Sequence, residues 1–213
     1  MPALVVSIDG PDFSGKTTIA NLVIEKLRSK YKGSDIIFLR TELPSILVTG
    51  SFTKILRNSA DVISPQVFAL AYATDHLNHY EKIIKPLKDA SEKYVVIQER
   101  SSLSMYIYQG LLGNVDINWL DEINKYNQNI PDLTLILVVD EEELLKRMKL
   151  EKRGFDKFEQ EDFIKKEVRV FYNLPKSLVE KFNVKYVSSD KDPMVVADKC
   201  VQKIASLIED KFK

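Results

Sequence analysis

The amino-acid sequence predicts an α/β fold in which a five-stranded, mainly parallel sheet is flanked by helices. Three observations support this prediction. Short apolar runs rich in β-branched residues recur along the chain, helical patterns separate them, and a glycine-containing loop joins the first run to the first helix. Such runs are typical of strands buried on both faces. Their alternation with helices favours right-handed crossovers between parallel strands.

Five apolar runs are the predicted strands, and their carboxyl ends indicate where functional residues are expected. The five runs are 4–8, 35–39, 94–98, 133–139 and 184–187. Ligands of open parallel sheets bind outside the carboxyl ends of the strands. Residues that directly follow these runs are therefore candidates for function.

The helices fill the intervals between these runs. The first is predicted over 17–31, directly after the glycine loop. The next begins at Ser64 and Pro65, an N-cap and first-turn pair, and extends towards Ile84, where Pro86 is expected to kink or end it. Further helices are expected at 103–112, 117–126, 141–150, 161–182 and 193–212.

Composition limits the class of partner. The 213 residues fit a single domain, 1–213, and the 31 Lys and Arg residues balance 31 Asp and Glu residues. This balance provides no general attraction to nucleic acid or to a membrane surface, so neither is expected as a partner. Cys200 is the only cysteine, and the N-terminal run ALVVSI is too short for a signal segment. A cytoplasmic protein that binds a small ligand is expected.

The segment GPDFSGKT carries the strongest motif. Gly10, four variable residues, then Gly15, Lys16 and Thr17 make the P-loop pattern, here between a strand and a helix. Backbone N–H groups of such a loop surround the phosphates, the lysine bridges the β and γ oxygens, and the threonine hydroxyl binds Mg²⁺. A chance glycine turn would not explain the strand, spacing and helix together. We predict a P-loop NTPase fold that binds ATP and Mg²⁺ through Gly10, Pro11, Asp12, Phe13, Ser14, Gly15, Lys16, Thr17 and Thr18.

A carboxylate and a guanidinium end the third predicted strand. Glu99 could hold the Mg²⁺ water shell or act as a base on an attacking oxygen, and Arg100 could bind a phosphate through two N–H groups. A structural ion pair is the alternative reading for an isolated pair. This pair is not isolated, because groups able to stack on a base and to hydrogen-bond its edge lie nearby. They are Tyr72, His76, Ser104, Tyr108 and Gln109.

These motifs together resemble the thymidylate kinase family over nearly the whole chain. The resemblance is carried by the phosphate loop, the ELPS turn, the helix ending in KP, Glu-Arg, SxxxYQG, PDLTLIL and the basic segment RGFDKFE. It implies ATP-dependent phosphorylation of dTMP to dTDP by a homodimer. It also implies roles for individual residues: Arg100 grips the acceptor phosphate, Tyr72 stacks on the base, Gln109 and Ser104 contact it, Tyr108 lies against the sugar, and Asp12 reaches the sugar 3′-hydroxyl.

The chain departs from the family pattern at three places. His76 stands where the family usually has a base-reading arginine. Glu99-Arg100-Ser101 stands where the family has Asp-Arg-aromatic. This Glu-Arg-Ser sequence also resembles the corresponding motif of deoxynucleoside kinases, in which the glutamate deprotonates the 5′-hydroxyl of a nucleoside. The acidic-proline turn is altered, so either Arg40 or Glu42 could face the ligand; Glu42 is counted among the substrate-binding candidates.

A basic segment at about 147–160 is predicted to act as a lid over the donor. Basic runs are often solvated faces, but phosphoryl transfer needs cations around the transferred group and exclusion of water. Arg153 is the first candidate for a catalytic role, beside Lys16, Glu99 and Arg100, and Arg147 is the second. Phe13 follows Asp12 where some family members carry an arginine, so the loop itself lacks that cation.

Two other functions remain as alternatives. One is a deoxynucleoside kinase in which Glu99 is the base. The other is a P-loop ATPase or switch, which would have no need for an aromatic and amide pocket and would be expected to carry guanine-reading or switch sequences that are not found here.

Overall fold

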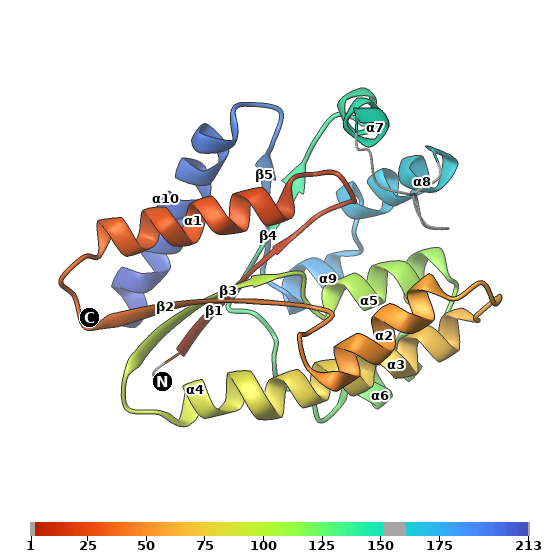
Figure 1. Ribbon diagram of the computed structural model, residues 1–213, viewed down its shortest axis with the longest axis horizontal. Coiled ribbons are helices and arrows are strands. Elements are labelled where there is room, and N and C mark those ends of the chain that lie inside the picture. The colour runs from red at the N-terminus through yellow and green to blue at the C-terminus, as the bar shows by residue number, and fades with distance from the viewer. Residues whose placement is uncertain (1–2, 151–160, 213) are drawn as a thin grey trace.

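The structure is a computed structural model that describes residues 3–150 and 161–212, and within them five parallel strands form one sheet (Figure 1). The order is β2-β3-β1-β4-β5, and every neighbouring pair is parallel. The strands are β1 (Ala3–Asp9), β2 (Ile36–Glu42), β3 (Lys93–Glu99), β4 (Leu133–Val138) and β5 (Val184–Ser188). The five predicted runs are confirmed, and the sheet is parallel throughout.

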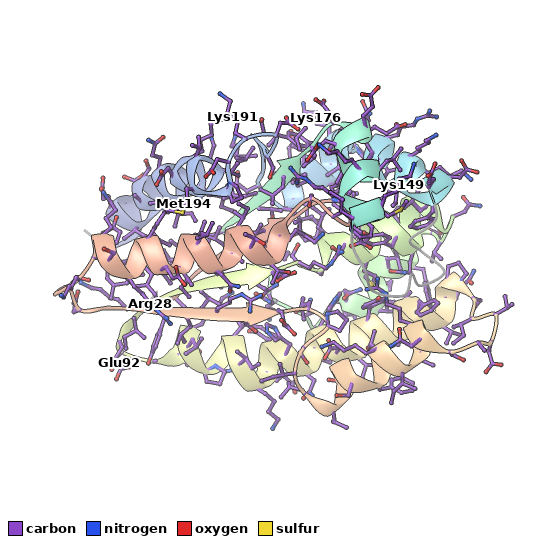
Figure 2. The ribbon with its side chains drawn as sticks, turned by 45° about the horizontal axis from the view of Figure 1, so that its top comes forward. Arg28, Glu92, Lys149, Lys176, Lys191 and Met194 are labelled. Atoms are coloured by element: carbon purple, nitrogen blue, oxygen red, sulfur yellow. The ribbon has the colours of Figure 1, made fainter. Side chains whose placement is uncertain are left out.

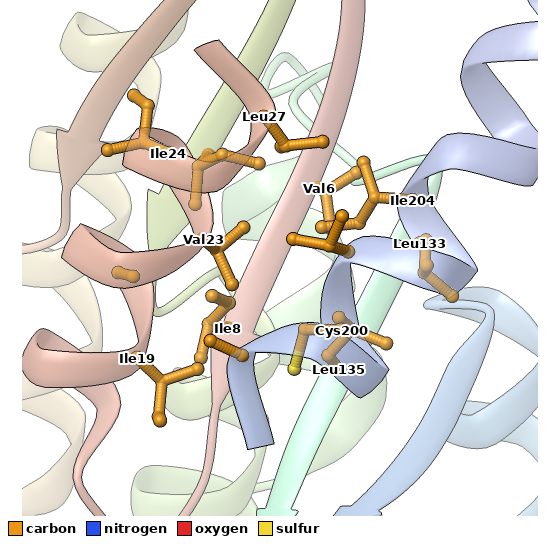
Figure 3. Packing of buried hydrophobic residues seen from close by; sticks show 14 of the residues in the cluster. Val6, Ile8, Ile19, Val23, Ile24, Leu27, Leu133, Leu135, Cys200 and Ile204 are labelled. Atoms are coloured by element: carbon orange, nitrogen blue, oxygen red, sulfur yellow. The ribbon is translucent and has the colours of Figure 1, made fainter. Parts of the chain in front are cut away.

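Helices α1 (Lys16–Lys30) and α10 (Pro193–Lys211) cover one face of the sheet. Leu4, Val6 and Ile8 alternate along β1 and belong to one buried cluster with apolar residues of both helices, as Figure 3 shows in part. Cys200 lies in this cluster as a buried free thiol. The central strand is thus held between layers, which fixes its carboxyl end and the loop that follows it.

The remaining helices lie mainly on the other face, where a second cluster is built around Ile136, Leu103 and Phe171. Helix α2 packs on α3, and α7 packs on α8. These elements are α2 (Val48–Asn58), α3 (Pro65–His79), the π-helical turn η1 (Tyr80–Ile84), α4 (Lys85–Asp89), α5 (Leu103–Met105), the π-helical segment η2 (Tyr106–Leu112), α6 (Ile117–Asn124), α7 (Glu141–Leu150), α8 (Glu161–Tyr172) and α9 (Lys176–Lys181).

The helix predictions need three corrections. The segment 161–182 is two helices, because Pro175 has no N–H to donate and precedes the first turn of α9. Helix α2 was not predicted, since Gly50 and several β-branched residues disfavour helix there. Pro86 does not end the helical path: a π-helical turn precedes it, and Pro86 lies in the first turn of α4.

Charged side chains project from the outside of the molecule. Figure 2 shows Lys149, Lys176 and Lys191 pointing away from the body, and all three are exposed. Within the described ranges, no helix has both the length and the apolar character needed to cross a bilayer.

Candidate active site

The phosphate loop begins where β1 ends and closes onto the start of α1. Gly10 has a φ of 147°, and a Cβ there would lie 3.1 Å from the carbonyl oxygen of Leu137 on β4. Gly15 has a φ of 88° and is the N-cap of α1. Both conformations favour glycine, so the loop can pass close to the sheet and turn its following amides towards the N-terminus of the helix.

Lys16 is buried inside this loop. Its Nζ donates to the carbonyl oxygens of Gly10 at 3.0 Å and Pro11 at 2.7 Å. Burial, followed by the charge of Arg100, lowers the pKa of Lys16 to about 8. The ammonium group is therefore costly to keep charged in the protein alone, and an anion in the loop would stabilise it.

Thr17 and Glu99 bring two hard oxygens together. The Thr17 hydroxyl donates to Glu99 Oε1 at 2.7 Å, and Arg40 donates to Glu99 Oε2 at 2.6 Å. Mg²⁺ usually takes one or two protein oxygens and fills its other positions with phosphate and water, so this pair suits it. The positions of Arg40 and Glu42 at the end of β2 are also clear: Arg40 binds Glu99, whereas Glu42 lines the cavity beside the loop and pairs with Lys54 at 3.5 Å.

Arg100 follows β3 in a left-handed conformation, with a φ of 62°. Its N–H donates to the carbonyl oxygen of Ile8 at 3.0 Å, and its carbonyl accepts from Gln98 at 2.8 Å. These bonds hold an unfavourable backbone conformation and turn the side chain towards the loop. There the guanidinium binds the carboxylate of Asp12 and lies over the ring of Tyr108, 5.6 Å from its centroid.

Two cavities meet at this arginine. The donor cavity surrounds Lys16 and Thr17, and the acceptor pocket lies between α3 and η2 beside Tyr72 and Gln109. Five residues line both cavities: Asp12, Leu43, Pro44, Arg57 and Arg100. A group bound in one cavity can therefore be approached from the other across Asp12 and the two arginines.

The acceptor pocket has an aromatic wall and unsatisfied polar atoms. Phe68, Tyr72 and His76 follow one another on α3, with ring centroids 6.4 and 6.1 Å apart. Gln109 Oε1 and His76 Nδ1 are buried and have no hydrogen-bond partner among the residues that the structure describes. Burial is the main cause that lowers the pKa of His76 to about 4, so its imidazole is neutral at physiological pH. Buried polar atoms without partners are expected where a ligand supplies them.

Ser104 also lines the pocket, but its hydroxyl is engaged elsewhere. It donates to Asp9 Oδ1 at 2.9 Å, and Asp9 also accepts the hydroxyl of Ser101 at 3.0 Å. The buried carboxylate of Asp9 thus ties the start of α5 to the end of β1. Contact of Ser104 with a base stays a prediction.

The basic segment is described only in part. Arg147 donates to Glu143 at 2.9 Å and to the carbonyl oxygen of Ser189 at 3.1 Å, and it lines the donor cavity with Phe13. Arg153 and the rest of the predicted lid from 151 onwards lie outside the described residues. The catalytic role of Arg153 stays a prediction.

Sequence reasoning missed three charged residues at this site. Arg57 and Lys54 lie on α2, the helix that was not predicted, and both line the donor cavity. Glu167 is buried on α8 and accepts the N–H of Asp12 at 2.9 Å. The apolar pattern around it indicates a helix, but no local signal in the sequence places this carboxylate against the phosphate loop.

The other residues that the sequence predicts for the site also lie at the two cavities or in the phosphate loop. Thr18 lines the donor cavity, and Tyr108 lines the acceptor pocket. Gly10, Pro11 and Ser14 shape the loop from behind, where the Ser14 carbonyl oxygen accepts from Ser189 at 3.3 Å. A phosphate loop, a threonine–glutamate pair beside it that would suit Mg²⁺, and a second pocket that meets the first at an arginine are the features of a P-loop nucleotide kinase.

The comparison with protein families identifies the particular class. The model of the thymidylate kinase family matches residues 8–195. A curated probable thymidylate kinase of Pyrobaculum calidifontis is 35% identical over 169 residues, which cover 79% of this chain and 80% of the relative. Another from Methanosarcina acetivorans is 28% identical over 98% of both chains. The chain belongs to the thymidylate kinase family.

Solved structures agree on the fold. A thymidylate kinase from Candida albicans superposes with a TM-score of 0.70 and 22% identity, covering 98% of this chain and 92% of the other. One from Ehrlichia chaffeensis gives a TM-score of 0.68 with 21% identity and coverage of 96% and 100%. The P-loop NTPase fold that the sequence predicts is confirmed.

Proposed function

We propose that this protein is an ATP-dependent dTMP kinase. The bond between the γ phosphorus of ATP and its bridging oxygen breaks, an oxygen of the dTMP phosphate forms a new bond to that phosphorus, and the products are ADP and dTDP. The observation that carries this proposal is the meeting of two cavities at Arg100 and Arg57. Cations between donor and acceptor are what in-line transfer to a phosphate requires.

On the donor side, Lys16 and the loop amides hold the triphosphate of ATP. Its phosphates would replace the carbonyl oxygens of Gly10 and Pro11 as partners of the ammonium group. Thr17 and Glu99 would hold Mg²⁺ directly or through its water shell. Bound there, the metal neutralises charge on the phosphate oxygens.

On the acceptor side, Arg100 and Arg57 bind the phosphate of dTMP and the pocket binds its thymine. Tyr72 offers a face for stacking, and Gln109 and neutral His76 offer unpaired hydrogen-bonding atoms to the base edge. Tyr108 forms part of the pocket wall, with the guanidinium of Arg100 over its ring, and would lie against the sugar. A neutral imidazole in place of a cation reads the base by hydrogen bonding alone.

We further propose that two copies pair through α2 and α3. Exposed apolar side chains gather on these helices and the loop between them: Val48, Phe52, Ile55, Val62, Val67 and Leu70. An apolar face of this kind is characteristic of interaction sites. Light scattering is expected to give a dimer that Ile55→Lys converts to a monomer, with exposed Ile37→Lys as the control; a monomeric wild-type protein would contradict the pairing.

A coupled assay of ADP release tests the activity. ATP and Mg²⁺ are offered with dTMP, dUMP, dGMP, dCMP, thymidine, or water alone. We expect dTMP to be the preferred acceptor. Turnover with thymidine but not dTMP would establish a deoxynucleoside kinase, and acceptor-independent hydrolysis would establish an ATPase or switch.

The predicted lid is tested by Arg153→Ala. If Arg153 stabilises the transferring phosphoryl group, kcat falls at least about tenfold with little change in melting temperature. Unchanged turnover would remove Arg153 from the catalytic account.

A further inference from the structure

Glu167 takes no part in the transfer described above, yet it contacts Asp12, which lines both cavities, and Tyr108, which lines the acceptor pocket. Its Oε1 accepts the backbone N–H of Asp12 at 2.9 Å and the hydroxyl of Tyr108. Arg100 binds the carboxylate of Asp12 and donates to the hydroxyl of Tyr108 at 3.3 Å. These contacts close a four-residue ring, made of Asp12, Arg100, Tyr108 and Glu167, that joins the phosphate loop, the end of β3, η2 and α8.

Helix α8 holds Tyr108 from several sides. Phe163, Glu167 and Phe171 are spaced by four residues and therefore share one face of the helix. The ring of Phe163 stacks on Tyr108 with centroids 6.4 Å apart, and the ring of Phe171 meets it edge-on at 6.0 Å. The position of the pocket wall at Tyr108 is thus set by α8.

Stability alone does not explain a carboxylate at this place. Glu167 is fully buried, and within residues 3–150 and 161–212 its Oε2 has no hydrogen-bond partner. Burial and the negative charge of Asp12 raise the pKa of Glu167 to about 7, while Tyr108, Lys16 and Arg100 act in the opposite direction. A buried carboxylate with an unpaired oxygen costs folding free energy that an apolar side chain would not.

We propose that Glu167 is a positioning residue that fixes the phosphate loop relative to the acceptor wall, by binding the Asp12 amide and the Tyr108 hydroxyl with one oxygen. The proposal rests on the proposed kinase function. In its ionised form Glu167 accepts both hydrogen bonds strongly, and in its protonated form it accepts them weakly. Because its pKa is raised rather than lowered, the ionised form is lost as the pH falls through about 7.

The test compares Glu167→Gln with Glu167→Ala. The glutamine keeps an oxygen that accepts both bonds and cannot ionise, whereas the alanine removes the acceptor. We expect Glu167→Ala to lower kcat/KM for dTMP about thirtyfold or more, as misplacement of bound groups does. Glu167→Gln should stay within about fivefold of the wild type. In the wild type, kcat/KM should fall as the pH drops below about 7, partly because Glu167 is protonated and partly because the phosphate of dTMP is protonated. Glu167→Gln should lose the first part of this fall and keep the second, which all variants share.

A double-mutant cycle with Tyr108→Phe and a surface control complete the experiment. If the ring acts as a unit, Glu167→Ala and Tyr108→Phe together cost less than the product of their separate fold-changes. The control is Glu180→Gln, an exposed carboxylate on α9 that should leave rate and pH profile unchanged. Variants that lower only the melting temperature and keep the wild-type kcat/KM and pH profile would overturn the proposal. Failure of the wild-type enzyme to use dTMP would instead overturn the proposed function.

Discussion

The donor loop and the acceptor pocket lie side by side but are built in different ways. The loop uses backbone atoms of a few consecutive residues, and its ammonium group and hydroxyl are paired within the protein, Lys16 with Gly10 and Thr17 with Glu99. The pocket uses side chains from separate elements, and it leaves polar atoms of His76 and Gln109 buried without partners in the described part of the chain. The loop is therefore ready for any triphosphate, whereas the pocket is incomplete until a particular base enters it.

Replacing Lys16 should give the largest effect and confine it to the donor side. Lys16→Met removes the cation that bridges the phosphates, and we expect kcat to fall about a hundredfold or more. The Kd of dTMP for the enzyme without ATP should change much less, because Lys16 lines the donor cavity and is not among the residues that line the acceptor pocket. Steady-state rates measure kcat, and calorimetric titration with dTMP measures its Kd. If Lys16→Met weakened dTMP binding by as large a factor as it lowers kcat, the donor loop and the acceptor pocket would not act as separate regions.

The next largest effect is expected at the junction. Arg57 lies 3.7 Å from Asp12 and lines both cavities. Arg57→Ala should raise KM for dTMP by about ten- to a hundredfold and also lower kcat, because the cation serves the acceptor phosphate before and during transfer. Arg169→Ala, at an exposed position on α8, is the control. If the substitution changed only KM for ATP, Arg57 would bind the ATP phosphates and not the phosphate of dTMP.

The same contrast explains what could be predicted from the sequence. The loop and its strand and helix are local, so spacing alone placed Gly15, Lys16 and Thr17 correctly. The sheet followed from apolar runs, with only its strand ends shifting. Arg57 was missed because the sequence of α2, the helix that carries it, has low helix propensity. Glu167 was missed because its hydrogen-bond partner is Asp12, 155 residues away in the sequence. Contacts between distant segments leave no local signal.

A smaller effect should appear in the acceptor pocket, with opposite signs for binding and stability. Gln109→Leu replaces a buried amide whose oxygen has no partner by an apolar group of similar size. We expect KM for dTMP to rise about tenfold, because the base loses a hydrogen-bonding group in a buried site. The free energy of unfolding without ligand should be unchanged or higher by about 1 kcal/mol. Urea unfolding and initial rates measure both, and an unchanged KM would show that Gln109 does not read the base.

The smallest effect concerns two neutral histidines of α3: His76, which lines the acceptor pocket, and His79, which does not. Burial lowers the pKa of His76 and of His79 to about 4, and His79 Nε2 lies 2.7 Å from the Thr41 hydroxyl. Since the histidines bind protons at about pH 6.5 in the unfolded chain but not in the folded chain, their contribution to stability should be constant above that pH. It should then fall towards pH 4 by about 1.4 kcal/mol per pH unit for each histidine. His79→Gln can keep the bond to Thr41 without titrating. It should remove the share of the acid dependence that belongs to His79, measured by urea unfolding at pH 7 and pH 5, while the raised pKa of Glu167 acts in the opposite direction in both proteins. An equal acid dependence in this variant would mean that His79 is not held neutral. The donor loop should show the same direction in a different pH window: because burial lowers the pKa of Lys16 from 10.5 to about 8, stability should rise with pH between about 8 and 10.5. The two regions would then be distinguished by pH as well as by ligand.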